Sequence, residues 1–243
     1  MDIVYVLGDG SRWGDNEIRY SLRSVQKNLG GAGKIVIVGQ LPEFIQNIIH
    51  IEAKDIFNPG GNADGNIITK VLAACRDKRV SENFLLMADD CMILKPVRAK
   101  KIPFFHKGNM AEFNEPGYFK HNIWRQRLGC TRDVLLQRGL TSYHFDCHRP
   151  MIINKKSFCR IMAKYDYASG IGFCIKSLYA NTAGVTPVRV KNMRYTIFKN
   201  YTVDEINDRL GEHTFLSVND SGLTETMKKW IVKKFHEKSK YEK

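Results

Sequence analysis

The stretch Asp2-Ile-Val-Tyr-Val-Leu7, which leads directly into Gly8-Asp9-Gly10, decides the fold. A short run of β-branched and aromatic residues that ends in glycines predicts a buried strand followed by a tight loop. Asp15 or Asn16 can cap a helix after this loop, and Lys34-Ile-Val-Ile-Val38 predicts a second strand. A strand, a helix and a strand in this order form a βαβ unit, which indicates a parallel sheet with a right-handed crossover.

The alternation of helices and strands continues along the chain and predicts an α/β fold, with a mostly parallel central sheet flanked by helices. Apolar spacing and turn residues predict a helix through 44–49, a Gly/Asn-rich turn at 58–62, a helix over 64–76, strands over 83–88 and 151–154, a helix over 157–165, a half-exposed strand over 188–191 and an amphipathic C-terminal helix through 227–235. We expect the Lys/Glu-rich tail after this last helix to fray.

The length of 243 residues, with 43% hydrophobic and 26% charged residues, is typical of one globular domain over 1–243. No apolar run approaches the about 18–20 residues of a membrane span, and the opening residues do not form a signal peptide. We therefore expect no transmembrane segment and a cytoplasmic location. The six cysteines show no C-x-x-C pair, which argues against a zinc knuckle and against a disulfide framework.

The charge balance is strongly basic, with 38 Lys and Arg against 25 Asp and Glu and a formal net charge of +13. Such an excess favours a polyanionic partner, and nucleic acid, an anionic membrane surface and a phosphate-rich small substrate all fit. Basic and aromatic residues interleave from Lys95 to Arg138, where the periodicity weakens. We interpret this stretch as an elaborated, partly helical excursion of the same domain.

The acidic pair Asp89-Asp90 follows directly after the apolar stretch Asn83-Phe-Leu-Leu-Met-Ala88. Ligands of open α/β sheets bind beyond the carboxyl ends of the strands, and Asp9 lies at the end of the first strand in the same way. Two adjacent carboxylates at a buried strand end need a counter-charge, either a basic side chain or a hard cation such as Mg²⁺ or Mn²⁺ that also binds a diphosphate. The alternative is a solvent-facing pair that caps the next segment.

The glycine-rich loop over 8–14 matches neither the Rossmann fingerprint nor a P-loop. It still permits close backbone approach to a nucleotide, with Asp9 available to a ribose or base and Arg12 or Arg19 to a phosphate. Lys70, on the helix that precedes the acidic pair, points to the same sheet edge. A plain turn that caps a helix is the alternative.

Two later polar segments carry further candidates. Asp146 and His148 are two residues apart within Tyr143-His-Phe-Asp-Cys-His-Arg-Pro150, so in an extended chain they share one side, and either can serve as a general base toward an acceptor hydroxyl. Hydrogen-bonded bystanders are the alternative. Asn219-Asp220 ordinarily form only a turn.

These residues match a family pattern. Asp2-Ile-Val-Tyr5, Asp9-Gly10-Ser11, Asp15-Asn16-Glu17-Ile18-Arg19-Tyr20-Ser21-Leu22-Arg23-Ser24-Val25, Ile35-Val-Ile-Val38 and Phe84-Leu-Leu-Met-Ala-Asp-Asp90 resemble the Stealth-type sugar-phosphate transferases and related GT-A-like glycosyltransferases. His148-Arg149-Pro150 and Val218-Asn219-Asp220 are similar to downstream elements of that family. Two departures, Val6-Leu-Gly-Asp-Gly10 in place of T-W-V-D-G and Ala88 in place of an Asn, leave sugar transfer and sugar-phosphate transfer both open.

The resemblance implies a GT-A-like fold, a nucleotide-diphosphate sugar such as a UDP-sugar as donor, and Mn²⁺ or Mg²⁺ as cofactor. It assigns residues 1–95 to the nucleotide-sugar-binding half and residues 96–243 to the acceptor side. The expected donor residues are Gly8, Asp9, Gly10, Arg19, Lys70 and Asp89, the expected metal ligands are Asp90, Asp89 and Asp220, and the expected catalytic residues are Asp146 and His148.

The basic charge and the resemblance together favour a glycosyltransferase whose acceptor is a hydroxymethylated base in DNA, as in phage DNA glycosyltransferases. The expected acceptor-binding residues are Lys100, Lys101, Arg125, Arg127 and Arg149, with Phe104, Phe105 or Trp124 to receive a flipped base. Synthesis of a surface polysaccharide or wall polymer is the first alternative. A nucleic-acid-binding module without catalytic activity is the second, although acidic residues at strand ends repel phosphate.

Overall fold

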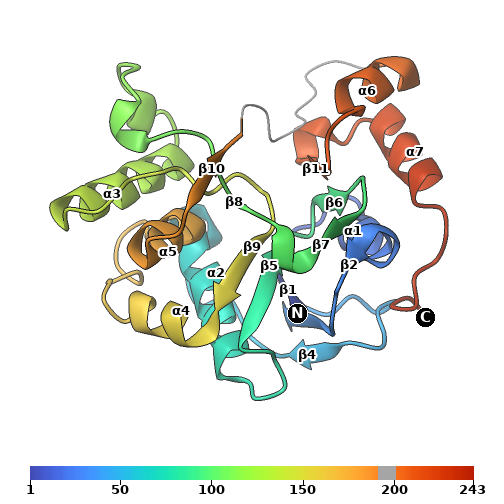
Figure 1. Cartoon of the computed structure of the whole chain (residues 1–243), viewed down its shortest axis with the longest axis horizontal. Helices are drawn as coiled ribbons and strands as arrows, with labels where there is room; N and C mark the ends of the chain where they lie inside the picture. Colours follow the sequence, from blue (N-terminus) through green and yellow to red (C-terminus); the bar gives the residue numbers. More distant parts are fainter. Residues whose placement is uncertain (191–200) are drawn as a thin grey trace.

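The central sheet has five strands in the order β4-β3-β1-β5-β9, in a computed structural model that describes residues 1–190 and 201–243 (Figure 1). The strands are β1 (Asp2–Leu7), β3 (Ile35–Gly39), β4 (Ile49–Ile51), β5 (Asn83–Met87) and β9 (Met151–Asn154). The first four strands are mutually parallel, and β9 runs antiparallel to β5. The predicted mostly parallel sheet is confirmed.

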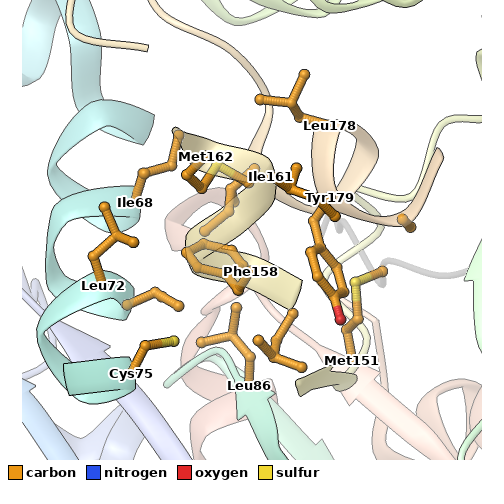
Figure 2. Packing of buried hydrophobic residues seen from close by; sticks show 14 of the residues in the cluster. Ile68, Leu72, Cys75, Leu86, Met151, Phe158, Ile161, Met162, Leu178 and Tyr179 are labelled. Carbon is orange, nitrogen blue, oxygen red and sulfur yellow. The ribbon is translucent and has the colours of Figure 1, made fainter. Parts of the chain in front are cut away.

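The two faces of this sheet bury alternate residues of each strand, as a strand period of two requires. Val4, Val36 and Leu86 pack with α2 (Pro59–Arg76), α4 (Lys155–Met162) and α5 (Ile175–Ala183) on one face. Figure 2 shows Phe158 of α4 among side chains of α2 and β5 in this cluster. The other face packs Tyr5 and its neighbours against α1 (Asn16–Asn28).

A third apolar cluster joins the C-terminal elements to the outer side of α1. It contains α6 (Val203–Leu210), β11 (Phe215–Ser217) and α7 (Glu225–Lys234), and the 3₁₀ turn η4 (Asp220–Gly222) lies between the last two. Strand β11 pairs antiparallel with β6 (Cys91–Ile93), which directly follows the acidic pair. This pairing brings Asp220 to the same end of the sheet as Asp89-Asp90.

The basic excursion is partly helical, as expected. Its elements are β7 (Val97–Arg98), which pairs with β2 (Leu29–Gly30), η1 (Ala99–Lys101), β8 (Phe104–His106), which pairs with β10 (Pro187–Arg189), η2 (Met110–Glu112), η3 (Tyr118–Lys120) and α3 (Ile123–Gln137). Helices α3 and α5 lie on one side of the molecule and α6 and α7 on the other (Figure 1). Among the described residues, no helix is both long and apolar enough to cross a membrane.

Three elements differ from the sequence-based expectation. The predicted helix through 44–49 is a turn that leads into β4, because Asn47 has a left-handed φ of 56° and Ile45 forms a β-bridge with Glu242. Helix α2 begins at Pro59 instead of about residue 64, because the side chain of Asn58 accepts a hydrogen bond from Gly60 N and caps it. Asn62, inside the predicted turn, has non-helical angles (φ −108°, ψ 62°), so the helix is kinked there. The predicted strand over 188–191 starts at Pro187, and its last residue, Lys191, lies outside the described residues.

The C-terminal tail does not fray. Gln46 N donates to Tyr241 O at 2.9 Å and Lys243 N donates to Phe44 O at 2.8 Å, so the tail pairs with the turn before β4. The side chain of Glu242 is completely buried against α1, where Arg19 and Arg23 contact it. Buried ion pairs and backbone pairing therefore replace the exposed tail that the local Lys/Glu composition suggested.

Candidate active site

A cleft of about 650 Å³ opens at the carboxyl ends of β1 and β5. The loop between β1 and α1, the residues after β5, the segment around Asp146, the N-terminal part of α5 and turn η4 all contribute to it. Nine of the donor, metal and catalytic residues that the sequence nominated line this cleft: Gly8, Asp9, Gly10, Lys70, Asp89, Asp90, Asp146, His148 and Asp220. The parallel neighbours β1 and β5 place their ends side by side, which explains why Asp9 and the acidic pair share one cavity.

The acidic pair is held at the floor of the cleft. Asp90 N donates to Asp89 Oδ1 at 3.0 Å, and Ser217 Oγ of β11 donates to Asp90 Oδ2 at 3.0 Å. Burial together with the charge of Asp90 raises the pKa of Asp89 to about 7, and Glu17 adds to the effect. Two carboxylates this close favour one protonated group unless a cation joins them.

His148 contacts the pair, with Nδ1 at 3.4 Å from Asp90 Oδ1. Its backbone φ is 51°, a left-handed conformation that costs free energy for a residue with a Cβ. Asp15, which also lines the cleft, has a φ of 57°. Such strain persists only where surrounding contacts enforce it, and it concentrates at functional sites.

Ser11 shapes the loop between β1 and α1. Its Oγ donates to Glu17 Oε2 at 2.7 Å and accepts from the backbone N–H groups of Trp13 and Asp15, at 3.2 and 2.7 Å. This turn leaves Gly8, Asp9 and Gly10 exposed at the mouth of the cleft.

Lys70 is 3% exposed, and its ammonium group is already engaged. Nζ lies 2.6 Å from Asp55 Oδ1 and donates to Leu7 O at 2.8 Å. A Cβ on Gly8 would lie 3.3 Å from Asp55 Oδ2, so this part of the loop packs closely on Asp55. Lys70 thus ties the end of β1 to the segment before α2.

Asp146 is bound by the N-terminus of α5. Its Oδ1 accepts from Lys176 N at 3.1 Å, and its Oδ2 accepts from the N–H and the hydroxyl of Ser177. These three hydrogen bonds fix the Asp146 carboxylate against the start of α5. Asp146 and His148 both line the cleft, as the sequence predicted for the two candidate bases.

Arg19, an expected donor residue, points away from the cleft. Its guanidinium contacts Glu242 at 2.9 Å and Asn16 at 2.9 Å, and it stacks over the ring of Phe44 at 3.7 Å. Arg19 is on α1, and the C-terminal tail attracts it because Glu242 is a buried anion. Arg19 was expected to line the donor pocket, but it is not among the residues that line the cleft and it pairs with Glu242 instead.

Two expected acceptor residues are buried instead of facing a ligand. Arg127 contacts Asp64 at 3.1 Å and donates to the carbonyl groups of Gly61 and Ile171, which fixes α3 to the start of α2. Arg149 is 6% exposed, with its guanidinium 5.2 Å from the ring of Phe105 and 5.0 Å from that of Phe215. Both side chains hold the fold together and offer no surface to a nucleic acid.

The other acceptor candidates stand apart from the cleft. Lys100 and Lys101 are exposed on η1 and do not line it. Arg125 stacks on the ring of Tyr118 at 4.3 Å. Of the aromatic residues proposed for a flipped base, Trp124 lines the cleft, whereas Phe104 and Phe105 pack against the apolar clusters.

The sequence analysis missed several acidic residues of the cleft. Nine carboxylates line it: Asp9, Asp15, Glu17, Asp55, Asp64, Asp89, Asp90, Asp146 and Asp220. Burial and the charge of Asp146 raise the pKa of Asp64 to about 7. Asp64, Ile67 and Lys70 are spaced by three residues on α2, so the helical period that exposes Lys70 to the cleft was an available signal for Asp64. No pattern in the sequence indicated that Lys176 would line the cleft.

The oxygen-rich walls suit a hard divalent cation. Within residues 1–190 and 201–243, no three His, Cys, Asp or Glu side chains are already arranged as a metal site. Asp220 is turned toward Arg12, whose Nε lies 3.3 Å from Asp220 Oδ2. Asp89 and Asp90 nevertheless supply adjacent carboxylate oxygens, which are the ligands that Mg²⁺ and Mn²⁺ prefer.

This chain is similar to known proteins in its three-dimensional structure. No family model matches the sequence, and the search of curated proteins finds no match. One similar solved structure is an active-site mutant of LgtC, with a TM-score of 0.53, 10% identity and coverage of 95% of this chain and 94% of that chain. Another is the galactosyltransferase LgtC with donor and acceptor sugar analogs, with a TM-score of 0.53, 9% identity and coverage of 98% and 96%. The chain therefore has the GT-A fold of LgtC, as the sequence predicted.

Proposed function

We propose that this protein is a divalent-metal-dependent glycosyltransferase that uses a nucleotide-diphosphate sugar. The observation that supports the proposal best is the cleft itself, in which the β1–α1 loop and the acidic pair share one cavity at the carboxyl ends of a GT-A sheet. A single such cavity allows donor, cation and acceptor to meet. Residues 1–95 supply most of the donor side and residues 96–243 the acceptor side in this proposal.

The nucleotide is assigned to the exposed loop Gly8-Asp9-Gly10. A Cβ at Gly10 would meet no atom within 4 Å, so the backbone at this position is open to a ligand. Asp9 is placed to accept hydrogen bonds from a ribose or a base, and Asp55 lies beside Gly8 in the same wall. A UDP-sugar is the donor we test first.

The cation is assigned to Asp90 and Asp220, with Asp89 as a direct or water-mediated contact. When bound, it supplies positive charge that stabilises the nucleoside diphosphate leaving group. The protein's own contribution is to hold Asp90 in place through Ser217 and through the backbone of the pair.

The acceptor is assigned to the wall formed by Trp124, Ile175, Lys176 and His148. Nδ1 of His148 faces Asp90, so we assign its other nitrogen, Nε2, to the acceptor hydroxyl as general base. Asp146 holds the N-terminus of α5 and with it Lys176. An aromatic ring beside carboxylates suits a hydroxyl-rich acceptor, because carboxylates accept hydrogen bonds from hydroxyl groups and repel phosphates.

The acidic lining bears on the DNA acceptor that the net charge suggested. Nine carboxylates repel a phosphate backbone from the cleft itself, so DNA would have to bind the exterior, for example at the exposed Lys100 and Lys101, and send only a base inside. A saccharide acceptor has no such requirement, and we propose it ahead of DNA.

Labelled transfer distinguishes these functions. The protein is mixed with a radiolabelled UDP-sugar and Mn²⁺ and then with hydroxymethylcytosine-containing DNA, unmodified DNA, or an oligosaccharide or lipid-linked saccharide. Label on a saccharide supports our proposal, and label confined to hydroxymethylated DNA restores the DNA assignment. No donor cleavage with any acceptor across a panel of nucleotide sugars would favour a binding module without catalytic activity.

A further inference from the structure

The cleft has many anionic side chains and few cationic ones. Its lining contains two lysines in addition to nine carboxylates, and both ammonium groups are engaged, Lys70 with Asp55 and Lys176 with Arg149 O at 2.8 Å. A donor diphosphate that enters this cleft carries at least two negative charges, so it needs cations from elsewhere. A single divalent ion offsets only part of the total.

Arg12 supplies a guanidinium beside the cleft, because its neighbour Ser11 and its partner Asp220 both line the cleft. It follows Ser11 in the β1–α1 loop, and its Nε lies 3.3 Å from Asp220 Oδ2 on η4. The side chain of Arg12 is 78% exposed and that of Asp220 is 52% exposed. An exposed pair at this distance contributes little stability, so either partner can be exchanged at small cost. Arg19, the other arginine suggested for phosphate, is bound to Glu242 instead.

We propose that Arg12 binds the donor diphosphate and reaches it by exchanging partners. In the free enzyme Arg12 pairs with Asp220; when a divalent cation takes the Asp220 carboxylate, the released guanidinium turns to the nucleoside diphosphate. A guanidinium can bind phosphate oxygens through two parallel hydrogen bonds, whereas Arg12 now contacts the Asp220 carboxylate on η4 through Nε. This inference rests on the proposed function. It assigns the binding of the donor phosphates to Arg12 of the β1–α1 loop.

The exchange makes an unusual prediction, because removing Arg12 should change two affinities in opposite directions. Without nucleotide, Arg12→Gln should tighten Mn²⁺ binding by about two- to fivefold, because Asp220 no longer has a competing partner. With saturating Mn²⁺, the same variant should weaken UDP binding by about tenfold or more, because a charge-assisted contact to phosphate is lost. If Arg12 only supported the loop, its removal would not change the Mn²⁺ affinity and the UDP affinity in opposite directions.

Isothermal titration calorimetry of the full chain tests this with Mn²⁺ alone and with UDP in saturating Mn²⁺. Arg160→Gln is the matched control, since Arg160 is exposed on α4 and does not line the cleft, and it should change neither affinity. Combining Arg12→Gln with Asp220→Asn should abolish the gain in Mn²⁺ affinity, and unchanged thermal unfolding of Arg12→Gln verifies that the loop variant folds.

The outcomes separate the inference from the function on which it rests. Wild-type protein that binds neither Mn²⁺ nor UDP overturns both. Wild-type protein that binds both, with an Arg12→Gln variant that binds Mn²⁺ no more tightly or UDP no more weakly, overturns the exchange and leaves the proposed function standing.

Discussion

Replacing Glu242 by glutamine removes the charge of a completely buried carboxylate while keeping its size. The carboxylate contacts Arg19 at 2.9 Å and Arg23 at 2.7 Å, and it accepts hydrogen bonds from the N–H and the hydroxyl of Ser239, both at 2.9 Å. Burial alone would raise the pKa of Glu242, but these hydrogen bonds lower it from the ordinary 4.5 to about 2.

The loss of stability that we expect for Glu242→Gln follows from the difference between these two pKa values. At about 1.4 kcal/mol per pH unit, a carboxylate with a pKa of about 2 in the folded state contributes about 3 kcal/mol of stability at neutral pH. The lowered pKa fixes the sign: this stability is fully present above the unfolded value of 4.5 and is lost as the pH falls toward about 2. At pH 7, we expect the free energy of unfolding of Glu242→Gln to be about 3 kcal/mol below that of the wild type. At pH 4, we expect this deficit to be smaller by about 1 kcal/mol.

Urea denaturation of both proteins at pH 7 and at pH 4 measures these differences. Glu237→Gln is the control, because Glu237 lies on the same tail with a side chain that is 74% exposed and should change stability by less than about 0.5 kcal/mol. If Glu242→Gln is as stable as the wild type at pH 7, or if its deficit does not shrink at pH 4, the tail is not held by this ion pair.

Three further predictions concern the cleft and its surroundings. Asp90→Asn should keep the fold but abolish metal-dependent donor cleavage, and wild-type turnover in EDTA would contradict the metal assignment. Arg127→Met should lower the free energy of unfolding by about 3 kcal/mol in urea, because the buried carbonyl groups of Gly61 and Ile171 lose their donor and Asp64 loses its partner; weaker acceptor binding at unchanged stability would return Arg127 to the acceptor surface. If DNA binds the exterior, Lys100→Gln with Lys101→Gln should reduce the slope of log K against log salt by up to about two, and an unchanged slope excludes η1 as its contact.

Strands β1, β3 and β5 were predictable because each is a short apolar run that reaches a glycine or an aspartate at its end or within two residues of it. The same feature located Asp9 and Asp89-Asp90, since neighbouring parallel strands end at one edge. The helix through 44–49 was wrong because Ile45 forms a bridge with Glu242 of the C-terminal tail, almost two hundred positions away, and Ile49 pairs with Val36 of β3. No local pattern contains that partner.

The arginines show the same limit in the site. Arg19, Arg127 and Arg149 belong to a strongly basic chain, so the sequence suggested phosphate as their partner, whereas the fold gives them Glu242, Asp64 and two aromatic rings. The composition gives the number of basic side chains. Only the tertiary structure shows which of them already pair with an acidic group or an aromatic ring. The cleft is acidic within a basic protein for this reason.

Thermal unfolding of the full chain with a panel of nucleotide sugars, in Mn²⁺ and in EDTA, tests most directly whether the cleft binds such a donor through a cation at Asp90. A ligand at about 100 times its dissociation constant adds about 2.7 kcal/mol, which raises the melting temperature of a chain of this size by about 5–10 °C. We predict this rise for at least one UDP-sugar with wild-type protein in Mn²⁺, and its loss both in EDTA and in Asp90→Asn. A melting temperature that no nucleotide sugar changes, or a rise that persists in Asp90→Asn, would contradict the account.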